Sequence, residues 1–430
     1  MNLKKELGLF HAIAIVIGMV IGSGIFFKPS IVFGAAGSPM LGILAWIVGG
    51  IIAMAAGLTI AEIASIIPKV GGVYAYIKEI YGEKAAFLLG WVQTLLYYPG
   101  SIAALAIVFS TQAAFLMPLS SIQQKVIAIS VVLALTISTI YSTKLSGRIQ
   151  GISTVAKLVP IAILVFFGLY NAGSTEIIQS DMPAVTITGF GAAILGTLWA
   201  YDGWASATNM AGEMKNPSKN LPKAIILGLS SVVVVYVIIN IAIISVMPFD
   251  KIIASETIAS DVAVALFGQG GASFIAVGII ISIFGTLNGY VLTGPRVTYA
   301  MAEKNTVPFS DKLASLTKSG TPRNALILQC VLSCIYVMSG TFEILTNLAI
   351  FSMWVFFTMT VFGVFILRKR MKDVVRPYKV PLYPVIPIIG VVGGAYIVIN
   401  TLFTDTINAL IGIGIALIGI PVYHYRLKRK

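Results

Sequence analysis

Two short clusters of glycine and polar residues interrupt long apolar runs of this sequence. They are Gly22-Ser23-Gly24, in the run at 9–34, and Trp199-Ala200-Tyr201-Asp202-Gly203, in the run at 187–212. Glycine in a helix interior is about 1 kcal/mol less favourable than alanine, and an acidic residue inside an apolar span marks a functional site by default. Both clusters therefore predict a helix that unwinds locally.

Each cluster also has a simpler interpretation. Gly18 and Gly22 form the G-x-x-x-G pattern of closely packed membrane helices, but that pattern leaves Gly24 unexplained. The aromatic residues of the second cluster would suit an interfacial belt at a membrane edge. Apolar residues continue on both sides of them, however, from 187 to 198 and from 205 to 211. Local unwinding is therefore the preferred interpretation.

The chemistry of a broken helix is specific. The break leaves N–H groups unpaired at the start of one half and carbonyls unpaired at the end of the other. The N–H groups near Ser23 would attract an anion such as an α-carboxylate. The carbonyls near Val20, Trp199 and Asp202 would accept hydrogen bonds from an α-ammonium. A zwitterion satisfies both sets without any pair of charged side chains.

The composition points to a protein embedded in lipid. Hydrophobic residues make up 58% of the 430 residues and charged residues only 10%, whereas soluble domains are about 25% charged. Continuously apolar runs of this length predict membrane-spanning helices rather than barrel strands. We therefore expect an all-α polytopic membrane protein with twelve transmembrane helices, of which helices one and six are unwound at mid-membrane. The twelve runs are 9–34, 40–67, 85–111, 124–141, 150–170, 187–212, 222–247, 271–300, 324–340, 343–367, 384–402 and 406–425.

The net charge of +13 reflects membrane topology and does not indicate nucleic-acid binding. An even number of spans puts both termini on one side, and the excess of Lys and Arg identifies that side as the cytoplasm. The basic segments are Lys4/Lys5, Lys69–Lys84, Lys144/Arg148, Lys215–Lys223, Arg296–Arg323, Arg368–Lys379 and Arg426–Lys430. The other connections carry the acids Glu176, Asp181, Asp250, Glu256, Asp261, Glu343 and Asp405. We expect a multi-pass protein of the plasma (inner) membrane with both termini cytoplasmic.

The two clusters lie in corresponding spans of two halves of the chain. Such pairing of interrupted spans is typical of transporters built from inverted repeats, with the binding site at the breaks. The sequence thus predicts a first repeat at 1–170 (spans 1–5), a second at 187–370 (spans 6–10), and two appended helices at 384–425.

Several motifs resemble those of a known family. They are Val20-Ile21-Gly22-Ser23-Gly24-Ile25-Phe26, Trp199-Ala200-Tyr201-Asp202-Gly203-Trp204 with Glu213–Pro217 and Asn220–Pro222 after it, and Arg376–Pro384. The first resembles the first-helix motif of the amino acid–polyamine–organocation superfamily, and the others resemble its L-amino-acid transporter branch. Within that branch the chain is similar to bacterial serine/threonine or alanine–serine–cysteine exchangers.

This resemblance implies a five-plus-five inverted-repeat fold of the bacterial leucine transporter type, working by alternating access. It also implies that Trp199 is the gate above the substrate. The substrate-binding residues it implies are Val20, Ile21, Gly22, Ser23, Gly24, Ile25, Trp199, Ala200, Tyr201, Asp202 and Gly203. The branch usually has an Asn after the second aromatic of the helix-six motif, where this chain has Ala205, so a contact by that Asn is not carried over.

Lys157 lies deep inside the span at 150–170. A buried lysine either extends its ammonium to the membrane surface or finds a partner. The resemblance implies that Lys157 substitutes for the cation of sodium-driven relatives, bonding carbonyls of span one and a hydroxyl of span eight such as Ser282. Because a buried lysine changes its pKa readily, proton coupling is the main alternative.

The sequence therefore predicts a sodium-independent transporter, an obligate exchanger of small neutral L-amino acids. A proton-coupled symporter is the alternative, and a channel is a rival from another class. No enzyme motif is present, and neither the cysteines (Cys330, Cys334) nor the histidines (His11, His424) have metal-ligand neighbours, so no cofactor or metal is expected. Animal members of the branch join a heavy chain through a cysteine after span three. Residues 117–125 contain no cysteine, so we expect no disulfide-linked heavy chain.

Overall fold

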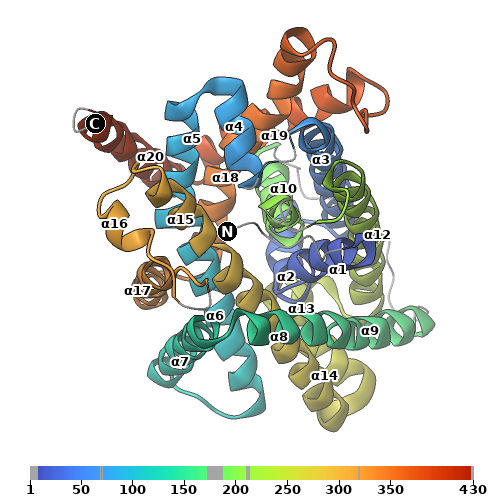
Figure 1. The fold of residues 1–430 in the computed structure, drawn as a ribbon. Coiled ribbons are helices and arrows are strands. Elements are labelled where there is room, and N and C mark those ends of the chain that lie inside the picture. The colour runs from blue at the N-terminus through green and yellow to red at the C-terminus, as the bar shows by residue number, and fades with distance from the viewer. Residues whose placement is uncertain are drawn as a thin grey trace.

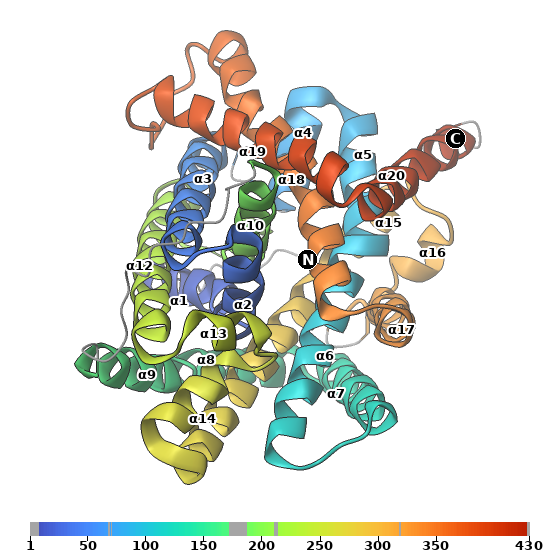
Figure 2. The same cartoon turned by 180° about the vertical axis from the view of Figure 1, so that it is seen from behind.

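The computed structural model describes residues 8–67, 69, 71–171, 187–209, 214–317 and 320–427. The regular elements of these residues are all helices, which form one bundle (Figure 1, Figure 2). The all-α prediction is confirmed. Several charged residues used above for topology and motifs lie outside the described residues, namely Lys4, Lys5, Glu176, Asp181, Glu213, Lys318, Lys428, Arg429 and Lys430.

The helices of the first half of the chain are α1 (Leu9–Val20), α2 (Gly24–Ala36), α3 (Pro39–Ile66), α4 (Gly72–Tyr81), α5 (Glu83–Val92), a π-helical turn (Gln93–Tyr97), α6 (Tyr98–Leu116), α7 (Ser121–Tyr141), α8 (Thr143–Ala156) and α9 (Leu158–Tyr170). Those of the second half are α10 (Ile187–Ala200), α11 (Ser206–Asn209), α12 (Pro217–Val246), α13 (Phe249–Ala254), α14 (Ile258–Thr293), α15 (Pro295–Glu303), α16 (Ser310–Leu313), α17 (Arg323–Ser339), α18 (Phe342–Arg370), α19 (Val385–Thr404) and α20 (Thr406–Leu427).

Many of these helices are long and apolar enough to cross a membrane. Among the described residues nine qualify, or ten if the bent pair α1 and α2 counts as one span. Two further apolar helices, Gly189–Ala200 and Arg323–Ser339, are shorter and fall in the predicted spans at 187–212 and 324–340. The protein is therefore a polytopic membrane protein, and the count of twelve spans stays a prediction.

Local sequence signals fix several helix ends. Ser38 caps α3 by accepting a hydrogen bond from the N–H of Leu41, with proline at the first helical position. Ser120 and Gln123 form a reciprocal capping box at the start of α7. Thr341 caps α18 in the same way as Ser38 caps α3. These caps set where the long helices enter the bundle.

The interrupted helices lie inside the bundle. α1 packs against α12, α2 packs against α10 and α3, and α14 packs against both α6 and α2. α10 lies near the middle of the bundle in both views, whereas α20 lies at its edge (Figure 1, Figure 2). Residues on α1, α2 and α10 are therefore held between helices from both halves of the chain.

Candidate functional site

Among the described residues, a helix ends near each of the two clusters. α1 ends at Val20 and α2 begins at Gly24, and the two helices are bent by 45° at this break. α10 ends at Ala200, residues 201–205 form a turn, and α11 begins at Ser206. The chain is thus non-helical at residues 21–23 and 201–205, which include Gly22, Ser23, Asp202 and Gly203.

The first break leaves backbone donors without acceptors. The N–H groups of Ser23, Gly24 and Ile25 donate no hydrogen bond to any described residue. The next two N–H groups, of Phe26 and Phe27, donate to the Ser23 carbonyl at 3.1 and 3.0 Å. Adjacent N–H groups of this kind at the start of a helix favour an anion, as does the dipole of the helix.

The carbonyls near the breaks are only partly available. The Val20 carbonyl accepts a hydrogen bond from the Tyr236 hydroxyl at 2.9 Å, and the Trp199 carbonyl accepts from the Asp202 N–H at 3.2 Å. No described residue donates to the Asp202 carbonyl. Because a carbonyl oxygen can accept two hydrogen bonds, all three keep capacity for a cation, and Asp202 keeps the most.

The two breaks cross each other with their backbones in contact. A β-carbon on Gly24 would lie 2.4 Å from the α-carbon of Ala200, and one on Gly203 would lie 2.8 Å from the Met19 carbonyl oxygen. Gly203 also has a positive φ of 105°, a backbone conformation that residues other than glycine rarely adopt. Glycine is required at both positions for this crossing.

A small cavity lies where the breaks cross. Its volume is about 10 Å³, room for roughly one water. The lining residues are Met19, Val20, Gly22, Ser23, Gly24, Leu105, Trp199, Asp202, Thr286 and Tyr290. Six predicted binding residues are therefore brought together, and the cavity must widen before it can admit an amino acid.

The other predicted binding residues lie around this cavity without lining it. Ala200 contacts Gly24 at the crossing, and Gly203 contacts Met19. Ile25 is buried in the core. The hydroxyl of Tyr201 donates to the Trp46 carbonyl at 3.0 Å, so this side chain points away from the cavity.

Trp199 covers one side of the cavity. Its indole nitrogen donates to the Ser23 hydroxyl at 3.3 Å. Its ring meets Phe342 edge to face, with 6.1 Å between ring centroids. Trp199 therefore lies between the cavity and the first turn of α18 and contacts both.

Lys157 is completely buried at the junction of α8 and α9. Its ammonium donates to the carbonyls of Gly18 and Ile21 at 2.7 and 2.5 Å, and to the Thr286 hydroxyl at 2.9 Å. The side chain does not reach the surface, so the alternative in which the ammonium extends to the membrane surface is wrong.

The structure corrects one residue of this site. The hydroxyl that accepts from Lys157 belongs to Thr286 rather than Ser282, which is four residues, about one helical turn, earlier on α14. Although Ser282 is buried, its hydroxyl has no hydrogen-bond partner among the described residues.

Three tyrosines were not predicted. The hydroxyls of Tyr97 and Tyr290 donate to the Asp202 carboxylate at 2.5 and 3.1 Å, and Tyr236 bonds Val20 as described above. Their sequence signal is a polar hydroxyl inside an apolar run. That signal does not identify partners 88 to 216 residues away.

A second polar cluster anchors the predicted Arg376–Pro384 loop to α3. The buried Glu62 carboxylate accepts two hydrogen bonds from Arg368, at 2.9 and 2.7 Å, and one from the Val380 N–H at 2.7 Å. Arg376 lies 3.3 Å from the same carboxylate. Glu62 thereby fixes the connection between α18 and α19.

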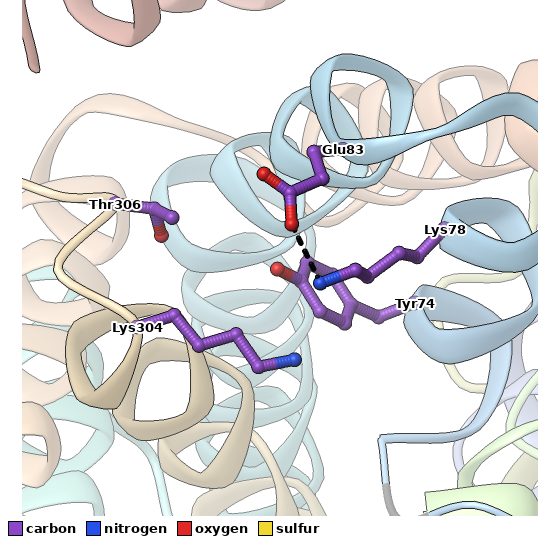
Figure 3. A pocket seen from close by; sticks show the side chains of 5 residues that line it. All are labelled: Tyr74, Lys78, Glu83, Lys304 and Thr306. Atoms are coloured by element: carbon purple, nitrogen blue, oxygen red, sulfur yellow. Dashed lines mark ion pairs between the residues drawn. The ribbon is translucent and has the colours of Figure 1, made fainter. Parts of the chain in front are cut away.

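A larger cavity of about 320 Å³ lies elsewhere, lined by Tyr74, Lys78, Glu83, Lys304 and Thr306. In Figure 3 the two lysines extend into it from opposite sides, and Lys78 pairs with Glu83 at 2.8 Å. It shares no lining residue with the cavity at the breaks. Charged lysine and glutamate side chains are typical of a water-facing surface. The smaller cavity at the helix breaks is therefore the better candidate for a substrate site.

The described residues contain no group of three or more His, Cys, Asp and Glu side chains able to hold a metal ion. The polar groups around the breaks are instead backbone N–H and carbonyl groups, hydroxyls, one ammonium and one carboxylate. This set suits the binding and release of a small organic zwitterion.

Fold and site together define a polytopic α-helical membrane protein with a buried site between two interrupted helices. The model of the family described as "Amino acid permease" matches residues 7–420, and the chain belongs to that family. This result confirms the resemblance found in the sequence, and it makes the protein a membrane transporter rather than an enzyme.

Named relatives cover nearly the whole chain. The serine/threonine exchanger SteT of Bacillus subtilis is 44% identical over 431 residues, covering 100% of this chain and 98% of the relative. The large neutral amino acids transporter small subunit 2 of Mus musculus is 33% identical, covering 98% and 81%. The b(0,+)-type amino acid transporter 1 of Mus musculus is 32% identical, covering 94% and 84%.

Proposed function

We propose that this protein exchanges small neutral L-amino acids across the cell membrane, without sodium, by alternating access. The observation that carries this proposal is the row of three unpaired N–H groups at Ser23, Gly24 and Ile25 beside the cavity. These donors suit the carboxylate of an amino acid, and the Asp202 carbonyl, helped by those of Val20 and Trp199, suits its ammonium. The name of the Bacillus subtilis relative, a serine/threonine exchanger, supports small neutral substrates.

Sodium independence rests on Lys157. Its ammonium lies between the carbonyls at the end of α1 and a hydroxyl of α14, which is the kind of oxygen-rich position that would otherwise hold a cation. A tethered ammonium there supplies the positive charge permanently. Proton-coupled symport is the alternative, and this buried amine is the observation that favours it.

The architecture proposed for this function has twelve spans, with helices one and six unwound at mid-membrane and both termini cytoplasmic. Residues 1–170 and 187–370 would be the inverted repeats, and 384–425 the appended helices. In this topology Trp199 closes the site towards the outside. The hydrogen bonds from Tyr97 and Tyr290 to Asp202 close it towards the inside. The protein would act without a disulfide-linked heavy chain.

Counterflow in vesicles tests the proposal. Purified protein is reconstituted into lipid vesicles preloaded with unlabelled L-serine, and uptake of labelled L-serine is measured with and without sodium. Exchange predicts uptake that requires internal amino acid and ignores sodium. Uptake that ignores internal amino acid but follows an imposed proton gradient would support symport. Flux that rises linearly with concentration would indicate a channel, and binding without flux would contradict transport.

A further inference from the structure

Lys28 is a second fully buried lysine, and the function proposed above does not use it. It lies on α2, four residues after Gly24, with no exposed surface. No carboxylate of the described residues lies within ion-pair distance of it. Its ammonium donates one hydrogen bond, to the Thr346 hydroxyl at 2.7 Å, and lies 5.1 Å from the centroid of the Phe342 ring.

Both partners of Lys28 belong to the start of α18. Phe342 is the first residue of that helix, and Thr346 is four residues, about one turn, later. Phe342 also contacts Phe27 of α2 and Trp199 of α10, each at 6.1 Å between ring centroids. The first turn of α18 therefore touches the first turn of α2 and the end of α10, directly over the predicted gate.

This closed contact is unfavourable for the ammonium. Burying a charge without a directly paired carboxylate is a large penalty. One hydrogen bond, one aromatic face and the carboxylate of Glu343, which acts on Lys28 from the first turn of α18 without forming an ion pair, offset only part of it. If α18 moves away from α2 and α10, water reaches the ammonium and the penalty disappears. The same movement uncovers Trp199 and the cavity behind it.

We propose that Lys28 is a gate residue that sets how often the outer face of the transporter opens. The buried charge keeps the closed contact between α2 and α18 from becoming too stable. The hydrogen bond to Thr346 and the ring of Phe342 keep the contact from opening freely. This proposal rests on the proposed function and on the topology that places this end of α2 outside.

Two substitutions should act in opposite directions. Lys28→Met keeps the length of the side chain but removes the buried charge, a change that often leaves folding intact or improves it. It should favour the closed contact and raise the external KM for L-serine by about tenfold, because less of the protein is open outwards. Thr346→Val removes the hydrogen bond but keeps the charge, so the external KM should fall.

The internal KM, measured on the opposite vesicle face, separates gating from a general structural effect. Gating predicts that the ratio of external to internal KM rises in Lys28→Met and falls in Thr346→Val. A merely structural role would change both values alike and lower the melting temperature. An unchanged ratio in both variants would overturn the proposal.

Chemical labelling of Lys28 gives a test that needs no transport. Cells expressing the protein are treated from outside with a membrane-impermeant amine-acylating reagent, and the lysines are quantified by peptide mass spectrometry. Lys125 and Lys251, which lie outside in this topology, are the positive controls. Lys28 should be acylated slowly in the native protein and several-fold faster in Thr346→Val.

Absence of Lys28 labelling in both proteins, with both control lysines labelled, would overturn the gate. If the vesicles exchange no amino acid at all, the proposed function fails. The labelling experiment still decides whether Lys28 opens to the outside.

Discussion

Replacing Lys157 with methionine keeps the stem of the side chain and removes its ammonium. Three hydrogen bonds disappear, to Gly18, Ile21 and Thr286. Hydrogen bonds to charged groups contribute about 1.5–3 kcal/mol each, so the gross loss is roughly 5–9 kcal/mol. The substitution also removes the desolvation penalty of a buried charge, which stabilises the folded protein by several kcal/mol. We therefore expect the free energy of unfolding to change by no more than about 2 kcal/mol.

The effect on the helix break should be larger than the effect on folding. The Gly18 carbonyl loses its donor, whereas the Ile21 carbonyl keeps the hydroxyl of Thr286 at 3.2 Å. One buried unpaired acceptor costs about 1–3 kcal/mol, which the break can recover only by rearranging. The lower figure corresponds to about fivefold in the population of the native break. Serine exchange by Lys157→Met should therefore fall at least about fivefold.

The assay is serine counterflow in vesicles, with thermal unfolding of the same preparation in detergent. Ser282→Ala is the matched control, because Ser282 is buried on the same helix as Thr286 but its hydroxyl has no partner among the described residues. It should exchange like the native protein. Native exchange by Lys157→Met would refute the role of Lys157, and equal losses in both variants would refute the assignment to Thr286.

Substitutions at three further positions test the gate, the crossing of the two breaks and the anchored loop. Trp199→Ala should lower exchange at least about tenfold by removing the cover over the cavity, measured as counterflow, and Trp199→Phe should retain more activity; equal, full activity in both would argue against the gate. Gly24→Ala should lose about 1–3 kcal/mol of stability by overpacking, since the new β-carbon meets the backbone of Ala200 at 2.4 Å. Gly34→Ala on the same helix, with its nearest neighbour 3.9 Å away, is the control for thermal unfolding, and equal stability of the two variants would contradict the crossing. Glu62→Gln should destabilise the protein by about 3–5 kcal/mol because it breaks a buried ion pair, and an unchanged melting temperature would show that the loop is held in another way.

The sequence predicted the helix breaks because their signal is local. Glycine and polar residues inside an apolar run are costly wherever the chain folds, so Gly22-Ser23-Gly24 and Asp202-Gly203 could be recognised without tertiary information. The carbonyls of span one as partners of Lys157 followed from the family resemblance. The partner on span eight did not, because Ser282 and Thr286 are one turn apart on one face of α14, and only packing decides between them.

Long-range contacts could not be predicted from one sequence. Tyr97, Tyr290 and Phe342 are ordinary apolar-run residues until the fold brings them to Asp202 and Trp199. Lys28 is a basic residue inside the apolar run at 9–34. Its hydrogen-bond partner Thr346 on α18 is 318 residues later in the sequence. Such contacts arise from helix packing, which hydropathy does not encode.

The proposed function depends on backbone groups of the first break binding the carboxylate of an amino acid. An experimental structure of the protein with L-serine bound would show whether they do. We expect carboxylate oxygens about 2.7–3.2 Å from the N–H groups of Ser23, Gly24 and Ile25, with the cavity widened beside Trp199. Serine bound elsewhere, or an unbroken helix from α1 through α2, would contradict it.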